Sequence, residues 1–413
     1  MSGSDGSNAS YGRGARILSV GIAATGLFTF LYFAVASHVV DEVEAKRLDV
    51  LWSVMFVVIS VIYRPIEQLL SRMLARNRAL GVHAHAIRTP LMLQGAFAAV
   101  FLACALALRG PIEDELFDGS TTLYWVFTAG TLFYAASYFA RGWLAGHQQF
   151  GLYGGLVLME SISRFLFPLA VAVGIASGQE AVALGIAAAP ALSLLVVPIA
   201  FSRRDPPVGA AERATARGST SFAVAVAFVM LAEQTLLNAA VLTTEITAED
   251  AVLAGIVFNV FLITRAPLQL FQAVQTSLLP HLSGLEATAG HEAFARAVRV
   301  TVLAIGAFGL AVALGLLTIG PWVMSTVFGQ DYDYGRVGLA LLGLGMGFHL
   351  MAGTFNQAKL ARGQATRAAI AWVAVAALFV VWTLLPVVDD PLLRAEIGYV
   401  AATGTLAALL VRE

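Results

Sequence analysis

Long apolar stretches alternate with short polar connections along the whole chain. Most of these stretches run about 20 to 25 residues, and a helix of roughly 20 apolar residues is long enough to cross the hydrocarbon core of a bilayer. We therefore expect twelve membrane-spanning helices, of which the last, ending at Val411, is the shortest. They begin near Ile17, Asp49, Thr89, Thr121, Leu152, Ala181, Ser219, Ala251, Val298, Arg336, Ala368 and Leu393.

The composition agrees with this pattern. Of the 413 residues, 59% are hydrophobic and 12% charged. An ordinary soluble domain has about 45–50% apolar and about 25% charged residues, so a soluble globular enzyme is excluded. The net charge of -1 gives no basic field for nucleic acid, and the single cysteine, Cys104, cannot form an internal disulfide. The sequence predicts an all-α, multi-pass protein of the cell's cytoplasmic (inner) membrane.

The basic residues predict the orientation. With the N-terminus in the cytoplasm, most of the 25 Lys and Arg residues fall in cytoplasmic connections, as the positive-inside rule requires. Both termini are then cytoplasmic. One alternative is open at the start of the chain, because Arg13 and Arg16 precede an apolar run that ends in Ala34, Val35 and Ala36 and resembles a cleavable signal peptide.

An internal repeat divides the chain into halves. Arg64 begins the pattern Arg-x-x-x-Gln-Leu with a proline just after the arginine, and Arg265 begins the same pattern 201 residues later. A weaker similarity links residues 139–148 with 355–364, and chance matches are the alternative for both. We expect a disordered cytoplasmic tail at 1–16, a six-helix bundle at 17–201, a cytoplasmic linker at 202–218 and a second six-helix bundle at 219–413. Such parallel repeats are typical of transporters with a site between the halves.

Six ionisable side chains fall inside the expected spans. Each costs about 2.5 to 3.5 kcal/mol at a lipid-facing helix centre, so these groups must face water, a substrate or one another. The six are Arg64, Glu67, Glu160, Arg164, Glu233 and Arg265.

The arginines of the repeat predict two polar stripes. Gln68 follows Arg64 by one helical turn, and Gln269 and Gln272 follow Arg265 on one face. The two stripes would line a central cavity between the bundles. In the alternative interpretation, both helices end soon after these arginines and the guanidinium groups snorkel to the interface.

The remaining charges also allow two interpretations each. Glu160 and Arg164 are spaced i, i+4, so they either neutralise each other within one helix or face the cavity. Glu233 either pairs with Arg265 across helices or titrates as a proton-coupling carboxylate.

Several local sequences resemble the multidrug/oligosaccharidyl-lipid/polysaccharide exporter superfamily, and within it the polysaccharide repeat-unit (O-antigen type) flippases. The resemblance covers nearly the whole chain. It rests on the division into six plus six spans and on four stretches of sequence. These are Arg64-Pro65, Arg265-Ala266-Pro267-Leu268-Gln269-Leu270, Leu279-Pro280-His281-Leu282-Ser283, and Arg141-Gly142-Trp143-Leu144-Ala145-Gly146-His147-Gln148-Gln149-Phe150.

This resemblance implies two six-helix bundles in a V around a central cavity. It implies alternating access that moves an undecaprenyl-pyrophosphate-linked oligosaccharide from the cytoplasmic to the outer leaflet, for cell-surface polysaccharide biosynthesis. Arg64, Arg164 and Arg265 would bind the pyrophosphate. Implied partners are the lipid-linked oligosaccharide, membrane lipid, and glycosyltransferases and a polymerase of the same pathway. Candidates for sugar hydroxyls are Gln68, Glu160, Glu233, Gln234, Asn238, Asn259, Gln269 and Gln272.

Other functions stay open at this point. A cation-coupled multidrug exporter of the same superfamily would use Glu233 or Glu160 as its coupling carboxylate. A major-facilitator transporter also has twelve spans, but its basic signature after the second span is not evident. A non-transport membrane component of glycan assembly would need a large external loop. No Walker A, G-x-S-x-G, H-E-x-x-H or CxxC motif occurs, so we expect that the protein is not an enzyme and binds no metal or cofactor. Na⁺ or H⁺ could serve as the coupling ion.

Overall fold

The computed structural model describes residues 20–21, 24–81, 87–196, 219–247, 251–288, 290–328 and 335–412, and in these ranges the chain is helical. The expected all-α class is therefore confirmed. The chain divides into two compact units, Met1–Ala223 and Val224–Glu413. Each unit is described by itself below.

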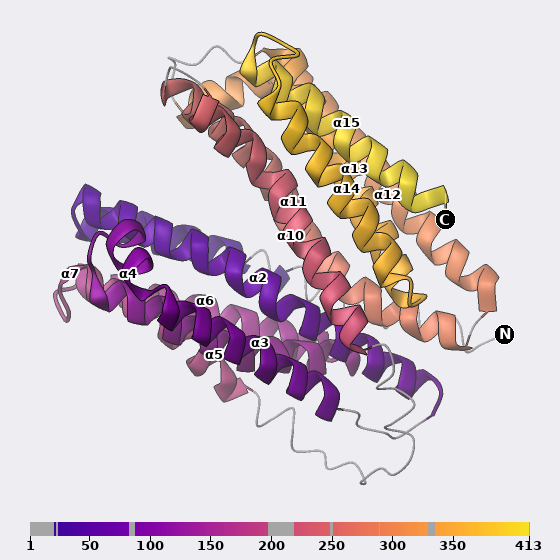
Figure 1. Ribbon diagram of the computed structural model, residues 1–413, viewed down its shortest axis with the longest axis horizontal. Helices are drawn as coiled ribbons and strands as arrows, with labels where there is room; N and C mark the ends of the chain where they lie inside the picture. Colours follow the sequence, from indigo (N-terminus) through magenta and orange to yellow (C-terminus); the bar gives the residue numbers. More distant parts are fainter. Residues whose placement is uncertain are drawn as a thin grey trace. The chain divides into compact units, whose positions relative to one another are not determined.

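The helices of the first unit run alongside one another (Figure 1). An initial helix, Ala24–Val39, precedes the labelled ones. The helices that follow are α2 (Glu42–Ala79), α3 (Arg88–Ala107), the short α4 (Arg109–Pro111) and η1 (Ile112–Leu116), α5 (Thr121–Gly146), α6 (Phe150–Ala172), α7 (Gly178–Ser193) and η2 (Leu194–Val196).

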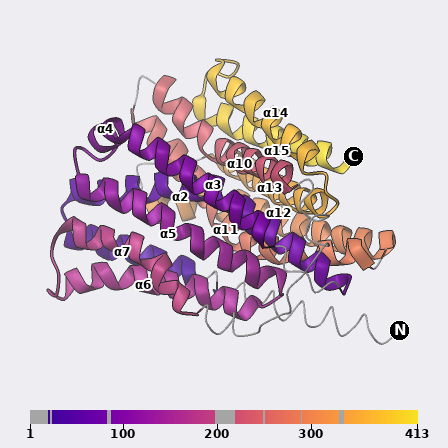
Figure 2. The same ribbon diagram turned by 60° about the horizontal axis from the view of Figure 1, so that its bottom comes forward.

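The second unit is likewise a bundle of long helices (Figure 2). Its first helix, α10, begins a few residues before the unit boundary. The helices are α10 (Ser219–Thr247), α11 (Ala251–Thr288), α12 (Gly290–Phe328), α13 (Arg336–Ala361), α14 (Ala365–Leu384) and α15 (Pro391–Arg412).

Helix starts follow the sequence signals closely where a capping residue is present. The Ser120 side chain accepts a hydrogen bond from the Leu123 backbone N–H at 3.3 Å, and α5 begins at the expected residue. By contrast, α12 begins at Gly290, well before the expected Val298. Hydropathy marks only the apolar part of a helix. The backbone hydrogen bonds of α12 form equally well in the more polar residues before Val298, so the helix begins earlier than its apolar part.

Membrane-spanning character is clear from length and composition. Among the described residues, seven helices are long and apolar enough to cross a bilayer, and Ala24–Val39 is a shorter apolar helix. Large apolar side chains of α12 point outward, with Leu303 66% and Trp322 66% exposed. An outward apolar surface of this extent is typical of contact with lipid.

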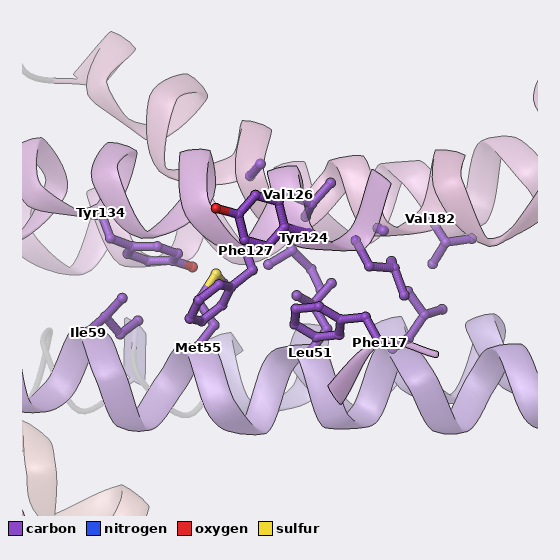
Figure 3. Packing of buried hydrophobic residues seen from close by; sticks show 14 of the residues in the cluster. Leu51, Met55, Ile59, Phe117, Tyr124, Val126, Phe127, Tyr134 and Val182 are labelled. Carbon is purple, nitrogen blue, oxygen red and sulfur yellow. The ribbon is translucent and has the colours of Figure 1, made fainter. Parts of the chain in front are cut away.

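The core of the first unit lies between α2, α5 and α7. Leu51, Met55 and Ile59 stand four residues apart on one face of α2, and Phe127 and Tyr134 of α5 pack against that face (Figure 3). All five side chains are buried. This apolar layer fixes the helix faces on which the polar residues of the same unit lie.

Glycine allows α5 to approach α2 closely. A Cβ atom added at Gly142 would lie 2.8 Å from the carbonyl oxygen of Glu67, and one added at Gly146 would lie 3.1 Å from that of Ser71. Small residues at such contacts are typical of membrane helix packing. The backbone of α5 is thereby held against the polar face of α2.

The end of α13 repeats the end of α5. The Gln149 N–H donates to the Leu144 carbonyl at 2.8 Å, and the Gln364 N–H donates to the Lys359 carbonyl at 2.9 Å. Both caps contain a residue with positive φ, Gln148 at 57° and Gly363 at 77°. The capping bonds are displaced by 215 residues, one fewer than the weak sequence similarity at these positions, so the structural equivalence is one residue out of register with the sequence match.

Candidate functional site

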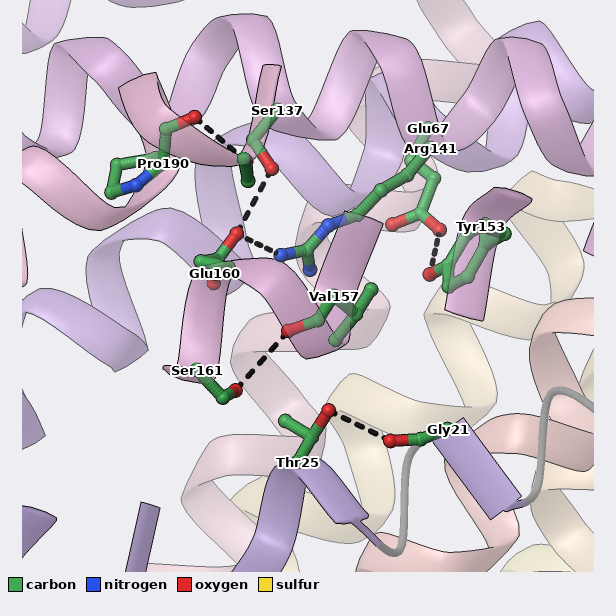
Figure 4. Close-up of polar contacts among 11 residues, drawn as sticks. Gly21, Thr25, Glu67, Ser137, Arg141, Tyr153, Val157, Glu160, Ser161 and Pro190 are labelled. Atoms are coloured by element: carbon green, nitrogen blue, oxygen red, sulfur yellow. Dashed lines mark hydrogen bonds and ion pairs between the residues drawn. The ribbon is translucent and has the colours of Figure 1, made fainter. Parts of the chain in front are cut away.

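Three helices of the first unit bring polar faces together. On α6, Glu160 and Arg164 lie on one face because they are four residues apart. Ser137 and Arg141 have the same spacing on α5, and Glu67 lies on the facing side of α2 (Figure 4). All five are buried. They form what we call the polar cluster of the first unit.

The centre of this cluster is an ion pair between α5 and α6. Arg141 Nη2 donates to Glu160 Oε2 at 2.6 Å, and Ser137 Oγ donates to the same oxygen at 3.0 Å (Figure 4). The Arg141 guanidinium carbon also lies 4.5 Å from the centroid of the Tyr138 ring. A short, charge-assisted hydrogen bond in a buried setting is strong, and removal of one partner leaves an uncompensated charge. This pair therefore locks α5 to α6.

A second carboxylate is held nearby. The Tyr153 hydroxyl of α6 donates to Glu67 Oε1 at 2.7 Å, which links α6 to α2. Arg64 and Arg141 both interact electrostatically with this carboxylate. Glu67 is 6% exposed, so its carboxyl group is surrounded by these protein groups rather than by bulk water.

Arg164 differs from the other arginines of the cluster. Its side chain is 2% exposed, and its guanidinium carbon lies 4.0 Å from the centroid of the Trp52 ring. Its Nε and Nη1 atoms have no hydrogen-bond partner among the described residues. Stacking on an aromatic ring supplies part of the lost solvation, but buried N–H donors without acceptors remain costly.

Buried hydroxyl groups of the first unit are also unsatisfied. The side-chain oxygens of Ser60, Tyr63, Thr131 and Tyr134 are buried without a hydrogen-bond partner in the described part of the chain. Tyr134 lies within electrostatic range of Arg164. Buried polar groups in native proteins are almost always satisfied by protein, water or a ligand. Together with Arg164, the first unit therefore buries several polar groups that lack a partner among the described residues.

The structure brings together four of the sequence candidates and corrects two interpretations. Glu67, Glu160, Arg164 and Arg64 all belong to this unit, with Arg64 half-buried. Glu160 pairs with Arg141 of the neighbouring helix, so of the two open interpretations the neutralisation by Arg164 within one helix does not hold, because a cross-helix partner approaches more closely. The alternative in which the helix ends soon after Arg64 does not hold either, since α2 continues to Ala79.

The other candidates lie elsewhere or outside the described side chains. Gln68 follows on α2, and the Gln68 carbonyl accepts a hydrogen bond from Ser71 at 3.1 Å. Asn238 donates to the Gln234 carbonyl at 2.7 Å on α10, close to Glu233 in sequence. Helix α11 continues to Thr288, so it too extends well past its arginine. The side chains of Asn259, Arg265, Gln269 and Gln272 are outside the described set, and so is the suggested pairing of Glu233 with Arg265.

Sequence reasoning missed several residues of both units. Arg141 was not among the candidate site residues, yet it is 9% exposed inside α5. Its spacing of four residues from Ser137 was an available signal. Tyr153 gave no signal, because a tyrosine near a helix end is common at membrane interfaces. In the second unit, His349 is 1% exposed and lies 3.8 Å, Nε2 to Oε1, from Glu233.

Solved structures with the same fold are transporters. A crystal structure described as MATE in the straight conformation matches with a TM-score of 0.81 at 15% identity, over 97% of this chain and 93% of that one. The outward-facing conformation of a multidrug resistance MATE family transporter of the MOP superfamily gives 0.79 at 12% identity, with the same coverage. A mutant of the Vibrio cholerae MATE transporter VcmN gives 0.75 at 13% identity, over 98% and 96%.

No family model and no curated protein matches the sequence. At these identities the likeness concerns the fold. The chain has the fold of a polytopic membrane transporter, as seen in MATE transporters of the MOP superfamily.

Proposed function

We propose that this protein is a flippase that moves an undecaprenyl-pyrophosphate-linked oligosaccharide repeat unit to the outer leaflet by alternating access, in cell-surface polysaccharide biosynthesis. It acts in the cytoplasmic membrane, beside the glycosyltransferases and polymerase of the same pathway. The transporter fold supports the reaction class. The polar cluster of the first unit supports the substrate class.

The observation that carries the proposal is the state of Arg164. A guanidinium group can only donate hydrogen bonds, and two of its donor atoms have no acceptor among the described residues. A phosphate or a sugar hydroxyl supplies acceptor oxygens, whereas an organic cation supplies none and would be repelled. The donor atoms are closed off in the present conformation, so the ligand would reach them when the helices rearrange during transport.

The balance of charge agrees with an anionic substrate. The polar cluster and the half-buried Arg64 next to it contain three arginines, Arg64, Arg141 and Arg164, and two glutamates, Glu67 and Glu160. Two of these positive charges can be balanced by the two carboxylates. Arg164 has no carboxylate at ion-pair distance among the described residues, so it is the arginine that we assign to the ligand.

A second candidate function has an observation in its favour. Solved structures with this fold include a multidrug resistance transporter, and Glu233 is a half-buried carboxylate in the second unit. A cation-coupled multidrug exporter would recognise organic cations through such a carboxylate.

The test compares both substrate classes in the same vesicles. Purified protein in proteoliposomes should move a fluorescent undecaprenyl-pyrophosphate disaccharide between leaflets, measured by its loss of accessibility to dithionite. Arg164→Gln should reduce this rate at least tenfold without lowering the melting temperature, because the substitution removes a buried charge that is incompletely solvated. Arg296→Gln, a change at an exposed arginine of α12, should match the wild type.

Two outcomes would contradict the flippase proposal. One is transport of ethidium, and not of the disaccharide lipid, by the wild type; this result would favour the multidrug exporter. The other is an unchanged rate for the disaccharide lipid in Arg164→Gln, because the donor atoms of Arg164 would then have no role in binding it.

A further inference from the structure

An open cavity lies in the first unit, between the initial helix (Ala24–Val39) and α2. Its volume is about 290 Å³, at the small end of the range for ligand pockets. Phe30 is 67% exposed and Asp49 is exposed as well, so the cavity opens outward at these residues. The lining includes Phe30, Phe33 and Ala34 of the initial helix and Ala45, Leu48 and Asp49 of α2.

The spacing of small and large residues forms this cavity. On the initial helix, Phe30 and Ala34 are four residues apart and share one face. On α2, Ala45, Leu48 and Asp49 share one face for the same reason. Leu48 is fully buried and closes the inner side. The space remains open because alanine, whose side chain is a single methyl group, stands on both helices.

The aromatic wall of the cavity is held in place by its neighbours. The Phe33 ring packs edge-on against Tyr32, with 4.9 Å between centroids, and lies 6.4 Å from the Trp52 ring. Tyr32 is fully buried, and its hydroxyl donates to the Val182 carbonyl at 3.1 Å. The face of such a ring is electron-rich and attracts a cation. The wall is therefore formed before a ligand binds.

A carboxylate stands beside this wall. Of the described residues that line the cavity, only Asp49 is ionisable, and it has no hydrogen bond or ion pair with another described residue. Arg47, two residues earlier on α2, donates instead to Asp118 at 3.0 Å. The side chain of Lys46 is outside the described set. The cavity thus combines an aromatic face with a carboxylate, which are two groups that favour a positively charged ligand.

An exposed apolar strip continues from the mouth of the cavity. Leu27 precedes Phe30 by three residues on the same face of the initial helix, and the two side chains are 57% and 67% exposed. A ligand that carries an alkyl chain would cover this strip, whereas a small hydrophilic amine would leave it bare. The surface therefore matches an amphiphile with a cationic head.

The depth of Asp49 matches the headgroups of a bilayer. Asp49 follows Glu42, the first residue of α2, by seven positions, which is about 10 Å along the helix axis. The second apolar stretch of the sequence begins near Asp49, so the residue lies where the hydrocarbon core meets the headgroup layer. In the orientation expected from the basic residues, this is the outer leaflet.

We propose that this cavity binds a phospholipid whose headgroup ends in a primary ammonium group. The ammonium donates hydrogen bonds to the Asp49 carboxylate and lies against the Phe33 ring, while an acyl chain follows Phe30 and Leu27. The inference goes beyond the proposed transport function, because the site does not include the polar cluster. The Asp49 carboxylate would repel the pyrophosphate of the transported lipid, so the two ligands do not share the cavity.

The lining does not suit a metal cation. Hard cations need several oxygen ligands that converge on one point. The cavity offers one carboxylate, and the hydroxyl of Ser37, which also lines it, donates to the Ala34 carbonyl at 2.9 Å. No group of three His, Cys, Asp or Glu side chains suited to a metal occurs in the part of the chain that the structure describes.

The experiment measures lipid retention by native mass spectrometry. Purified, delipidated full-length protein is mixed with equal amounts of phosphatidylethanolamine and phosphatidylglycerol that carry the same acyl chains. The wild type should retain phosphatidylethanolamine in preference, by about fivefold or more, because only this headgroup has an ammonium for Asp49 and Phe33. Asp49→Asn, which keeps the size and removes the charge, should bring the ratio close to one. Asp114→Asn, the same change at an exposed acid of η1, should keep the ratio of the wild type.

A second variant tests the cavity without a change of charge. Ala45→Leu places a larger side chain in the lining and should reduce the amount of phosphatidylethanolamine that is retained. Ala295→Leu, the same change at an exposed alanine of α12, should match the wild type. Equal retention by Ala45→Leu and the wild type would show that the lipid binds elsewhere.

Three further results would overturn the proposal. One is an unchanged preference for phosphatidylethanolamine in Asp49→Asn. The second is displacement of the lipid by an equal concentration of phosphoethanolamine, which has the same headgroup and no acyl chain. The third is displacement by ethidium, which would make the cavity a site for organic cations. No transported substrate takes part in this measurement, so its failure and the failure of the flippase assay are separate results.

Discussion

The two units of the chain bury opposite kinds of polar chemistry. In the first unit, Arg141 and Glu160 form an ion pair at 2.6 Å, and two nitrogen atoms of the Arg164 guanidinium have no acceptor among the described residues. In the second unit, His349 Nε2 and Glu233 Oε1 stand 3.8 Å apart, beyond hydrogen-bond distance. Arginines keep their charge and suit the binding of an anion, whereas a histidine beside a carboxylate offers no such fixed positive charge. We therefore assign the proposed anion-binding role to the first unit.

The largest expected effect is a loss of stability when Arg141, which is paired with Glu160, is replaced. Arg141→Gln leaves the Glu160 carboxylate buried without its partner, so it should destabilise the protein by about 3–5 kcal/mol. Thermal unfolding of the purified protein measures this loss. The double variant Arg141→Met with Glu160→Met should recover most of it, because no unpaired charge remains.

The matched change at Arg164 sharpens the contrast. Arg164→Gln should leave the unfolding temperature equal to or above that of the wild type, since the Nε and Nη1 atoms of Arg164 are buried without acceptors among the described residues. Equal destabilisation by Arg141→Gln and Arg164→Gln would show that both arginines serve the fold alone.

A smaller effect is expected where α5 meets α2. Gly142→Ala places a methyl group 2.8 Å from the Glu67 carbonyl oxygen, so the helices must separate, at a cost of about 1–3 kcal/mol. Gly155→Ala on α6 is the matched control, because nothing lies within 4 Å of the added atom. The same unfolding assay should find the control unchanged or slightly stabilised by its better helix propensity. Equal behaviour of the two variants would contradict the close approach.

The smallest effect lies on the surface of the first unit, at the connection between α3 and α5. The Thr121 hydroxyl and then the Arg109 guanidinium hold the pKa of Glu113 below its ordinary value by donating hydrogen bonds to its carboxylate. The contact is therefore complete above the ordinary glutamate pKa of about 4.3, and it is lost as the pH falls through the lowered value. Amide hydrogen exchange at η1 should increase only below about pH 4. An increase already near neutral pH would contradict this assignment.

The sequence predicts where helices begin better than it predicts which helices pack against one another. The expected starts at Thr121, Ser219, Ala251 and Arg336 coincide with those of α5, α10, α11 and α13, because apolar length and capping residues are local signals. The sequence also drew attention to Glu67, Glu160 and Arg164, which the structure buries, because an ionisable group in an apolar stretch is conspicuous.

Pairing could not be predicted, because it depends on which helices pack together. Glu160 has Arg164 one turn away in sequence, yet its partner is Arg141 on another helix. His349 was overlooked because a single histidine in an apolar segment has no meaning until Glu233 and Tyr399 are placed beside it. The close contacts of Gly338 and Gly345 with side chains of α15 likewise become visible only from the packing of α13 against α15.

The measurement that most directly tests the central claim is ligand-dependent stabilisation of the purified protein. Undecaprenyl pyrophosphate should raise the unfolding temperature of the wild type, because a ligand that binds the folded state stabilises it. The same lipid should give a much smaller shift with Arg164→Gln and the full shift with Arg296→Gln. An equal shift for Arg164→Gln and the wild type, or stabilisation by ethidium alone, would contradict an anion-binding role for the first unit.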